Sequence, residues 1–188
     1  MINLMVDLET LDNKAGAVIT QVALVQFDRQ TGLIPGKEFY RNVNAVSCQK
    51  AGMTISADTV MWWFKQSKEA QESLLKDPSP IPVQNMLNEL NCWLISLRTD
   101  FQDKFSIWCH ATFDFPILNR AFELCEIVPA WGYRDARDIR TVTDLSGVDP
   151  WAYKMPEGQA HNALNDAKNQ VIYTVDCLNV LASRKEKV

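Results

Sequence analysis

Apolar and polar residues alternate with a period of two at the start of the chain. Residues 2–10 therefore predict a strand on which Asp7 and Glu9 project from the same face, while the apolar residues between them pack against neighbouring elements. Residues 18–27 and 37–43 are rich in β-branched and aromatic residues, and turn residues separate them from each other and from the first strand. These three segments predict an antiparallel meander.

The period changes to that of a helix after residue 55, and a short apolar run at residues 105–109 predicts one further strand. Pro82 and Pro116 suit the first turns of two of these helices, and the last helix leads into a basic tail. The expected helices cover residues 56–64, 67–76, 82–97, 116–125, 138–145 and 164–181. Strands followed by interleaved strands and helices predict an α/β fold with a central sheet, as one domain over residues 1–188.

Composition narrows the class of protein. The chain has 188 residues, 47% hydrophobic and 22% charged, and no apolar run long enough to span a membrane. The N-terminus lacks the features of a signal peptide, so we expect a cytoplasmic protein without a membrane partner. The net charge of -4 argues against a broad basic surface for nucleic acid, so any such contact must be local or carried by metal ions.

Acidic residues mark the candidate site. Asp7 and Glu9 stand side by side, and paired carboxylates repel each other unless a cation lies between them. A solvated strand end is the alternative interpretation of this pair alone. Two later segments favour the cation site over the solvated strand end. Asp114 follows the predicted strand at 105–109, and His161 and Asp166 flank the start of the last helix.

The acidic residues and the histidine occur in three motifs that resemble those of the DnaQ-like, or DEDDh, 3'-to-5' exonuclease superfamily: Asp7-x-Glu9-Thr10, Phe113-Asp114 and His161-x-x-x-x-Asp166. The resemblance covers nearly the whole chain. Trp62-Trp63 and the basic segment at 134–141 make it most similar to the phage and bacterial branch of T4 DexA-like and Rv2179c-like exonucleases. The resemblance implies an RNase H-like fold, with a five-stranded mixed sheet flanked by helices.

Phosphodiester hydrolysis needs a deprotonated water and compensation for charge that builds on the phosphate, and two divalent cations supply both. The resemblance implies two Mg²⁺ or Mn²⁺ ions per site, which prefer carboxylate oxygen. Asp7 would bridge both ions, Glu9 and Asp166 would complete the site of the nucleophile-binding ion, and Asp114 would bind directly or through water. His161 would be the general base, since the ordinary pKa of imidazole lies near working pH.

Substrate contacts follow from the same resemblance. Thr10 and Leu11 stand where family members touch the terminal nucleotide, and Trp62, Trp63 and Phe113 are candidates to stack on bases. Two adjacent tryptophans in an amphipathic helix favour burial of one of them. The candidate phosphate partners are Arg134, Arg137, Arg140, Lys154 and Lys168.

The expected activity is that of a metal-dependent 3'-to-5' exonuclease that releases nucleoside 5'-monophosphates from single-stranded or overhanging 3' ends. DNA and RNA both stay open as substrates, because a single hydrogen bond distinguishes the 2'-hydroxyl. One alternative is a proofreading-type module that mainly docks on a replication partner, and another is an oligoribonuclease for very short RNA. The resemblance also allows a homodimer, although no stretch of the sequence indicates an interface.

Overall fold

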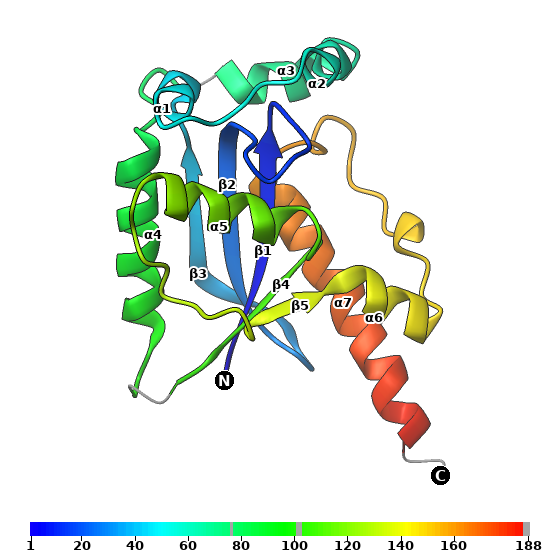
Figure 1. The fold of residues 1–188 in the computed structure, drawn as a ribbon. Coiled ribbons are helices and arrows are strands. Elements are labelled where there is room, and N and C mark those ends of the chain that lie inside the picture. The colour runs from blue at the N-terminus through cyan, green and yellow to red at the C-terminus, as the bar shows by residue number, and fades with distance from the viewer. Residues whose placement is uncertain (76, 101–102, 186–188) are drawn as a thin grey trace.

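The computed structural model describes residues 1–75, 77–100 and 103–185, which form a five-stranded sheet in the order β3-β2-β1-β4-β5 (Figure 1). The first three strands pair antiparallel, and β4 and β5 continue the sheet parallel to β1. The strands are β1 (Ile2–Thr10), β2 (Ile19–Asp28), β3 (Gly32–Asn42), β4 (Phe105–Cys109) and β5 (Ala136–Asp138). The predicted mixed sheet with an antiparallel meander is confirmed.

Helices follow the predicted segments closely. Residue 76, the expected end of one helix, and residues 186–188 of the expected basic tail lie outside the described residues. The helices are α1 (Ala45–Lys50), α2 (Ala57–Trp63), α3 (Lys68–Leu75), α4 (Val83–Leu97), α5 (Asp114–Leu124), α6 (Ile139–Ser146), the 3-10 turn η1 (Pro150–Ala152) and α7 (Ala163–Lys185). Among the described residues, no helix has the length and apolar composition needed to cross a bilayer.

The sequence did not predict two short elements, α1 and β5, because their sequence signals are weak. The short helix α1 begins after Asn44, whose side chain accepts a hydrogen bond from the N–H of Ser47. The strand β5 has three residues and ends at Asp138, whose side chain caps α6 through the N–H of Thr141. The third strand also starts earlier than residue 37, since Leu33 already pairs with Phe27 next to the turn in which Asp28 accepts from the N–H of Thr31.

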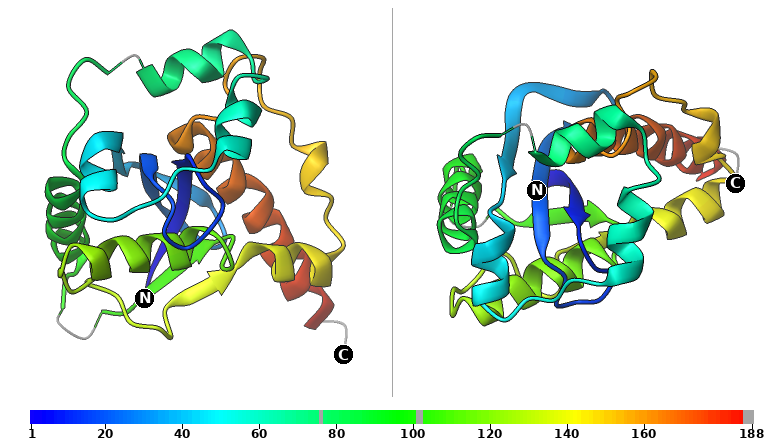
Figure 2. Two further views of the ribbon diagram at one scale, coloured as in Figure 1. Left: turned by 45° about the horizontal axis from the view of Figure 1, so that its top comes forward. Right: turned by 90° about the horizontal axis from the view of Figure 1, so that it is seen from above.

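Helices cover both faces of the sheet (Figure 2). Even-numbered residues of β1, such as Leu4 and Val6, pack with α4 and α5, whereas Met5 belongs to the core under α7. Asp7 and Glu9 share the face of Met5, so they point toward α7. The predicted alternation along β1 thus decides which helix meets the two acids.

The carboxyl ends of β1 and β4 lie at the same edge of the sheet, since the two strands are parallel. Figure 1 shows α2 and α3 across this edge, with the start of α7 beside them. In open α/β sheets this edge is the usual location of a binding site.

Candidate active site

The end of β1 carries the first two acids into a buried position. Asp7 and Glu9 lie opposite Ala23 and Gln21 of β2, and each carboxylate side chain is almost fully buried. The strand β1 is paired with β2 on one side and with β4 on the other, so its backbone is fixed and the two side chains stay buried. The structure therefore holds two acids where solvent screens them little.

Asp114 reaches the same place from the other side of β1. The strand β4 ends at Cys109, and a turn at His110 leads into α5, whose first residue is Asp114. Its carboxylate accepts from the backbone N–H of His110 at 2.9 Å, so it closes this turn instead of capping the helix. Burial raises the pKa of Asp114 to about 7, against the opposing effects of that hydrogen bond and of nearby Arg140.

The start of α7 brings the third motif to the acids. Asn162 accepts a hydrogen bond from the N–H of Asn165, which orders the first turn of the helix and places Asp166 within it. One potential ligand atom from each of Glu9, His161 and Asp166 lies within 4.8 Å of the others. The two motifs that the sequence separates by about 150 residues are therefore in direct proximity.

Burial and mutual repulsion together set the electrostatics of this cluster, and burial is the larger effect. Burial raises the pKa of Asp7 well above its ordinary value, and Asp114, Glu9 and Asp166 each raise it further. Burial and then Asp166 raise the pKa of Glu9 in the same direction. All four predicted acids therefore belong to a single electrostatic cluster.

Gln170 is a site residue that the sequence motifs did not reveal. Its side-chain N–H donates to Asp7 Oδ1 at 2.6 Å, which opposes the rise in the pKa of Asp7. Its Oε1 atom is buried without a hydrogen-bond partner among the described residues. Gln170 stands four residues after Asp166 on the same face of α7, so a polar side chain on an otherwise buried helix face was the available signal.

Trp62 and Trp63 form an aromatic wall beside His161. The indole N–H of Trp63 donates to the Thr10 carbonyl at 2.9 Å and the side chain is 4% exposed, whereas Trp62 is 43% exposed. The prediction that one of the pair is buried is confirmed. The imidazole of His161 packs edge-to-face on Trp62 at 5.0 Å between ring centroids and on Trp63 at 6.0 Å.

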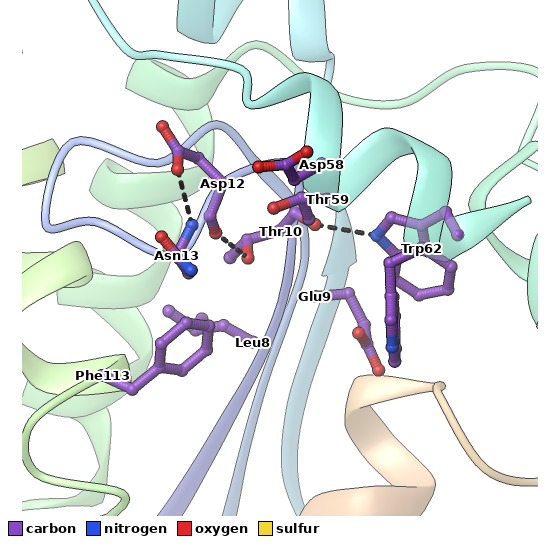
Figure 3. Close-up of a pocket in the computed structure, with 10 residues that line it drawn as sticks. Leu8, Glu9, Thr10, Asp12, Asn13, Asp58, Thr59, Trp62 and Phe113 are labelled. Carbon is purple, nitrogen blue, oxygen red and sulfur yellow. Dashed lines mark hydrogen bonds between the residues drawn. The ribbon is translucent and has the colours of Figure 1, made fainter.

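A cavity of about 410 Å³ opens next to the acids (Figure 3). The rings of Phe113 and Trp62 stand on opposite sides of Glu9 in Figure 3. The residues that line the cavity are Leu8, Glu9, Thr10, Asp12, Asn13, Asp58, Thr59, Trp62, Trp63 and Phe113. Four of the predicted substrate-binding residues, Thr10, Trp62, Trp63 and Phe113, therefore border one cavity.

Leu11, Arg137 and Lys168, which are further predicted contacts, do not line this cavity. Leu11 packs against the hydrophobic core, and the guanidinium of Arg137 donates to the carbonyls of Arg134 and Ala136. Their roles in binding substrate stay predictions. Lys168 forms an ion pair with Glu38 at 2.7 Å, on β3.

Arg140 is the predicted phosphate partner that lies near the acids. Its guanidinium donates to Thr112 Oγ1 at 3.2 Å and lowers the pKa of Asp114, although burial of that carboxyl outweighs this effect. The side chain is exposed at the start of α6. An arginine in this position adds positive charge close to an otherwise acidic site.

A family model described as the 3'-5' exoribonuclease Rv2179c-like domain matches residues 2–178. The chain belongs to this family. It is therefore a 3'-5' exonuclease domain with an RNase H-like fold, and the resemblance to 3'-5' exonucleases read from the three motifs is confirmed.

Relatives outside the family model agree with this assignment. The exodeoxyribonuclease of Enterobacteria phage T4 is 23% identical over 92% of this chain and 87% of its own length. Three solved structures share the fold at TM-scores of 0.61, 0.60 and 0.52: the cell-death related nuclease CRN-4, the nuclease domain of 3'hExo bound to rAMP, and S. pombe Pop2p with Mg²⁺ and Mn²⁺.

The solved structures are distant in sequence, at 20%, 13% and 14% identity in the same order. They cover 95%, 95% and 93% of this chain. The chain spans 64% of CRN-4, 92% of the 3'hExo domain and 81% of Pop2p. These likenesses concern the fold.

Replacing Asp7 by Asn tests the repulsion in the acidic cluster. The raised pKa of Asp7 means that its ionisation costs stability, a cost that is absent below the unfolded pKa of about 4, grows as pH rises from there to the folded pKa, and is complete above the folded pKa. In EDTA, Asp7→Asn should therefore raise the melting temperature at pH 8, by about 2 to 4 °C for each kcal/mol of repulsion removed, and change it little at pH 4.

Thermal denaturation followed by circular dichroism at the two pH values measures this difference. Asp144→Asn, at an exposed position on α6, is the matched control and should leave the melting temperature nearly unchanged at both. A lower melting temperature for Asp7→Asn at pH 8 would contradict the repulsion.

Proposed function

We propose that this domain is a metal-dependent 3'-to-5' exonuclease that releases nucleoside 5'-monophosphates from single-stranded or overhanging 3' ends. The observation that carries the proposal is the convergence of Asp7, Glu9, Asp114 and Asp166, with His161, at the end of β1 beside an aromatic cavity. Cations bound between the carboxylates reduce the repulsion among them, and the same cations attract phosphate.

The donor set fits hard divalent cations. Three buried acids and the half-buried Asp166 supply oxygen ligands, burial and mutual repulsion raise the pKa values of Asp7 and Glu9, and Gln170 leaves a buried carbonyl oxygen without a partner among the described residues. Mg²⁺ or Mn²⁺, at two per site, would stabilise the charge that builds on the reacting phosphate and make a water easier to deprotonate. The Mg²⁺ and Mn²⁺ in the structure of Pop2p support this choice of ions.

In this proposal the side chains divide the work. Asp7, whose pKa all three other acids raise, would hold both ions, and Glu9 and Asp166 would hold the one nearer His161. His161 accepts the proton of the attacking water on an imidazole nitrogen, and Trp62 and Trp63 restrict the ring to the site. Asp114 completes the acidic set directly or through a water.

Substrate binding combines stacking with local positive charge. Trp62 and Phe113 offer ring faces at the cavity, where stacking contributes about 1 to 3 kcal/mol per base, and Arg140 is placed to contact a phosphate. Two relatives, 3'hExo bound to rAMP and the phage T4 exodeoxyribonuclease, support a nucleic acid substrate. The name of the phage T4 enzyme refers to DNA and the description of the family refers to RNA, so both polymers belong in the assay.

The docking alternative is less well supported. A module that mainly binds a protein partner has no need for four crowded acids beside a cavity, because their repulsion destabilises the fold without a compensating ligand. The oligoribonuclease alternative differs in substrate length, so a length series belongs in the assay.

A degradation assay tests the proposal. Single-stranded DNA and RNA of equal sequence, labelled at the 3' end or the 5' end and from two to about 20 nucleotides long, are incubated with Mg²⁺, Mn²⁺ or EDTA. We expect 3' label to appear at once as monophosphate, 5' label to shorten stepwise, and EDTA to stop both. Folded protein that releases no monophosphate from either polymer would refute the function, and activity confined to substrates of two to about four nucleotides would favour the oligoribonuclease.

His161→Ala separates a base from a ligand. Loss of a positioned general base should lower kcat by about 10²- to 10⁴-fold and leave Mn²⁺ binding within about twofold of the unchanged protein. Isothermal titration with Mn²⁺ and single-turnover kinetics measure the two quantities. A loss of Mn²⁺ affinity in His161→Ala as large as its loss of kcat would make the histidine a ligand.

Gln170→Leu tests the orientation of Asp7. Leucine has a similar volume but no N–H to donate to Asp7 Oδ1, and loss of a partner that orients a ligand costs about 10- to 100-fold in metal affinity or activity. Mn²⁺ titration measures the change, with Gln84→Leu at an exposed position on α4 as the matched control. Equal Mn²⁺ affinity and turnover in both variants would remove Gln170 from the site.

A further inference from the structure

His161 has an unusual backbone conformation for a residue with a side chain. Its φ is 62°, which lies in the left-handed region. Among the described residues other than glycine, only Glu126 shares this conformation. A conformation of this kind persists only where surrounding groups hold it. The contacts that hold His161 are therefore candidates for setting where its ring lies.

Gln21 joins the two elements on either side of His161. It is fully buried on β2, directly opposite Glu9 in the strand register. Its side-chain N–H donates to the carbonyl of Ser73 on α3 at 2.9 Å, and its Oε1 accepts from the N–H of Ala163 at 3.1 Å. Ala163 is the first residue of α7 and follows His161 by two positions.

The helix α3 touches the segment before α7 at two more points. Ser73 Oγ lies 2.7 Å from the carbonyl of Ala70 and 3.2 Å from that of His161, so its one proton can serve either. Gly158 has a φ of 77°, and a Cβ atom there would lie 3.2 Å from Glu69 Cγ. Residues 158–161 therefore rest against α3 by their backbone.

We propose that Gln21 is a positioning residue, which fastens α3 and the start of α7 to β2 and thereby fixes the His161 ring relative to Glu9. This rests on the proposed function, in which His161 takes the proton. The strand register supplies the common reference, because Gln21 and Glu9 are opposite each other on neighbouring strands. The aromatic wall then confines the ring, while the amide of Gln21 fixes the backbone that carries it.

Loss of the Gln21 amide should affect proton transfer and leave the acids in place. In the described structure the side-chain amide of Gln21 hydrogen-bonds Ser73 and Ala163 and none of the four acids. A displacement of about 1 Å at a reacting group can lower the rate about 10²-fold. The expected signature is a fall in kcat with unchanged KM and unchanged Mn²⁺ binding.

A double-mutant cycle tests this role. Gln21→Met removes both hydrogen bonds with a side chain of similar length, and it is made with His161 present and in a His161→Ala background. We expect kcat to fall by about 10- to 100-fold with His161 present, and by less than about twofold in the His161→Ala background, because a residue that acts through His161 is not additive with it. KM and Mn²⁺ affinity should stay within about twofold.

A measurement without turnover accompanies the cycle. The chain has two histidines, so ring-labelled protein gives two imidazole signals in NMR, which His161→Ala assigns. In Gln21→Met the His161 signal should shift and the His110 signal should not. Wild-type protein that releases no monophosphate would refute the proposed function, whereas this spectrum would still decide whether Gln21 positions the ring.

Ser73 provides a second route if Gln21→Met does not fold. Ser73→Ala removes the hydroxyl near the His161 carbonyl, and Ser73→Thr restores it, so the first should lower kcat about three- to tenfold and the second should recover it. Ser96→Ala is the matched control, since Ser96 Oγ makes the same 2.7 Å bond within its own helix, far from the site in sequence. Equal falls in kcat with and without His161, or an unmoved His161 signal, would overturn the proposal.

Discussion

Repulsion between buried carboxylates is the constraint on which the rest of this structure depends. Asp7 lies on the central strand, where burial raises its pKa and three other acids raise it further in a site that water hardly screens. The fold opposes this repulsion with the N–H of Gln170, the N–H of His110 and the charge of Arg140. These contacts are too few to neutralise four acids, so the site retains negative charge that divalent cations can relieve.

The sheet explains how the acids and the histidine stay in register. Parallel pairing of β1 with β4 brings Asp114 to the end of β1, and α7 crosses the face toward which Asp7 and Glu9 point. On the neighbouring strand, Gln21 faces the start of α7 from a position opposite Glu9. One strand pair therefore carries both the acid and the group that holds the backbone near His161.

Chemistry and recognition occupy adjoining parts of the site. The acids lie on the side of β1 that α7 covers, while the cavity extends from Glu9 toward Trp62 and Phe113. Ring faces bind bases with little regard to sequence, and the overall charge of -4 offers no broad attraction for a polyanion. In the function proposed above, nucleic acid affinity would be concentrated at this site, which suits an enzyme that binds only the end of a strand.

The sequence by itself determined the alternation of β1, the helical segments and the three motifs, because these depend on local period and on residue type. It missed β5 and α1, which are too short to show a period. Tertiary structure alone decided the partners of Gln170 and Gln21. Their hydrogen bonds join residues 163 and 142 positions apart, and such pairs arise only when α7 packs on the sheet in one particular register.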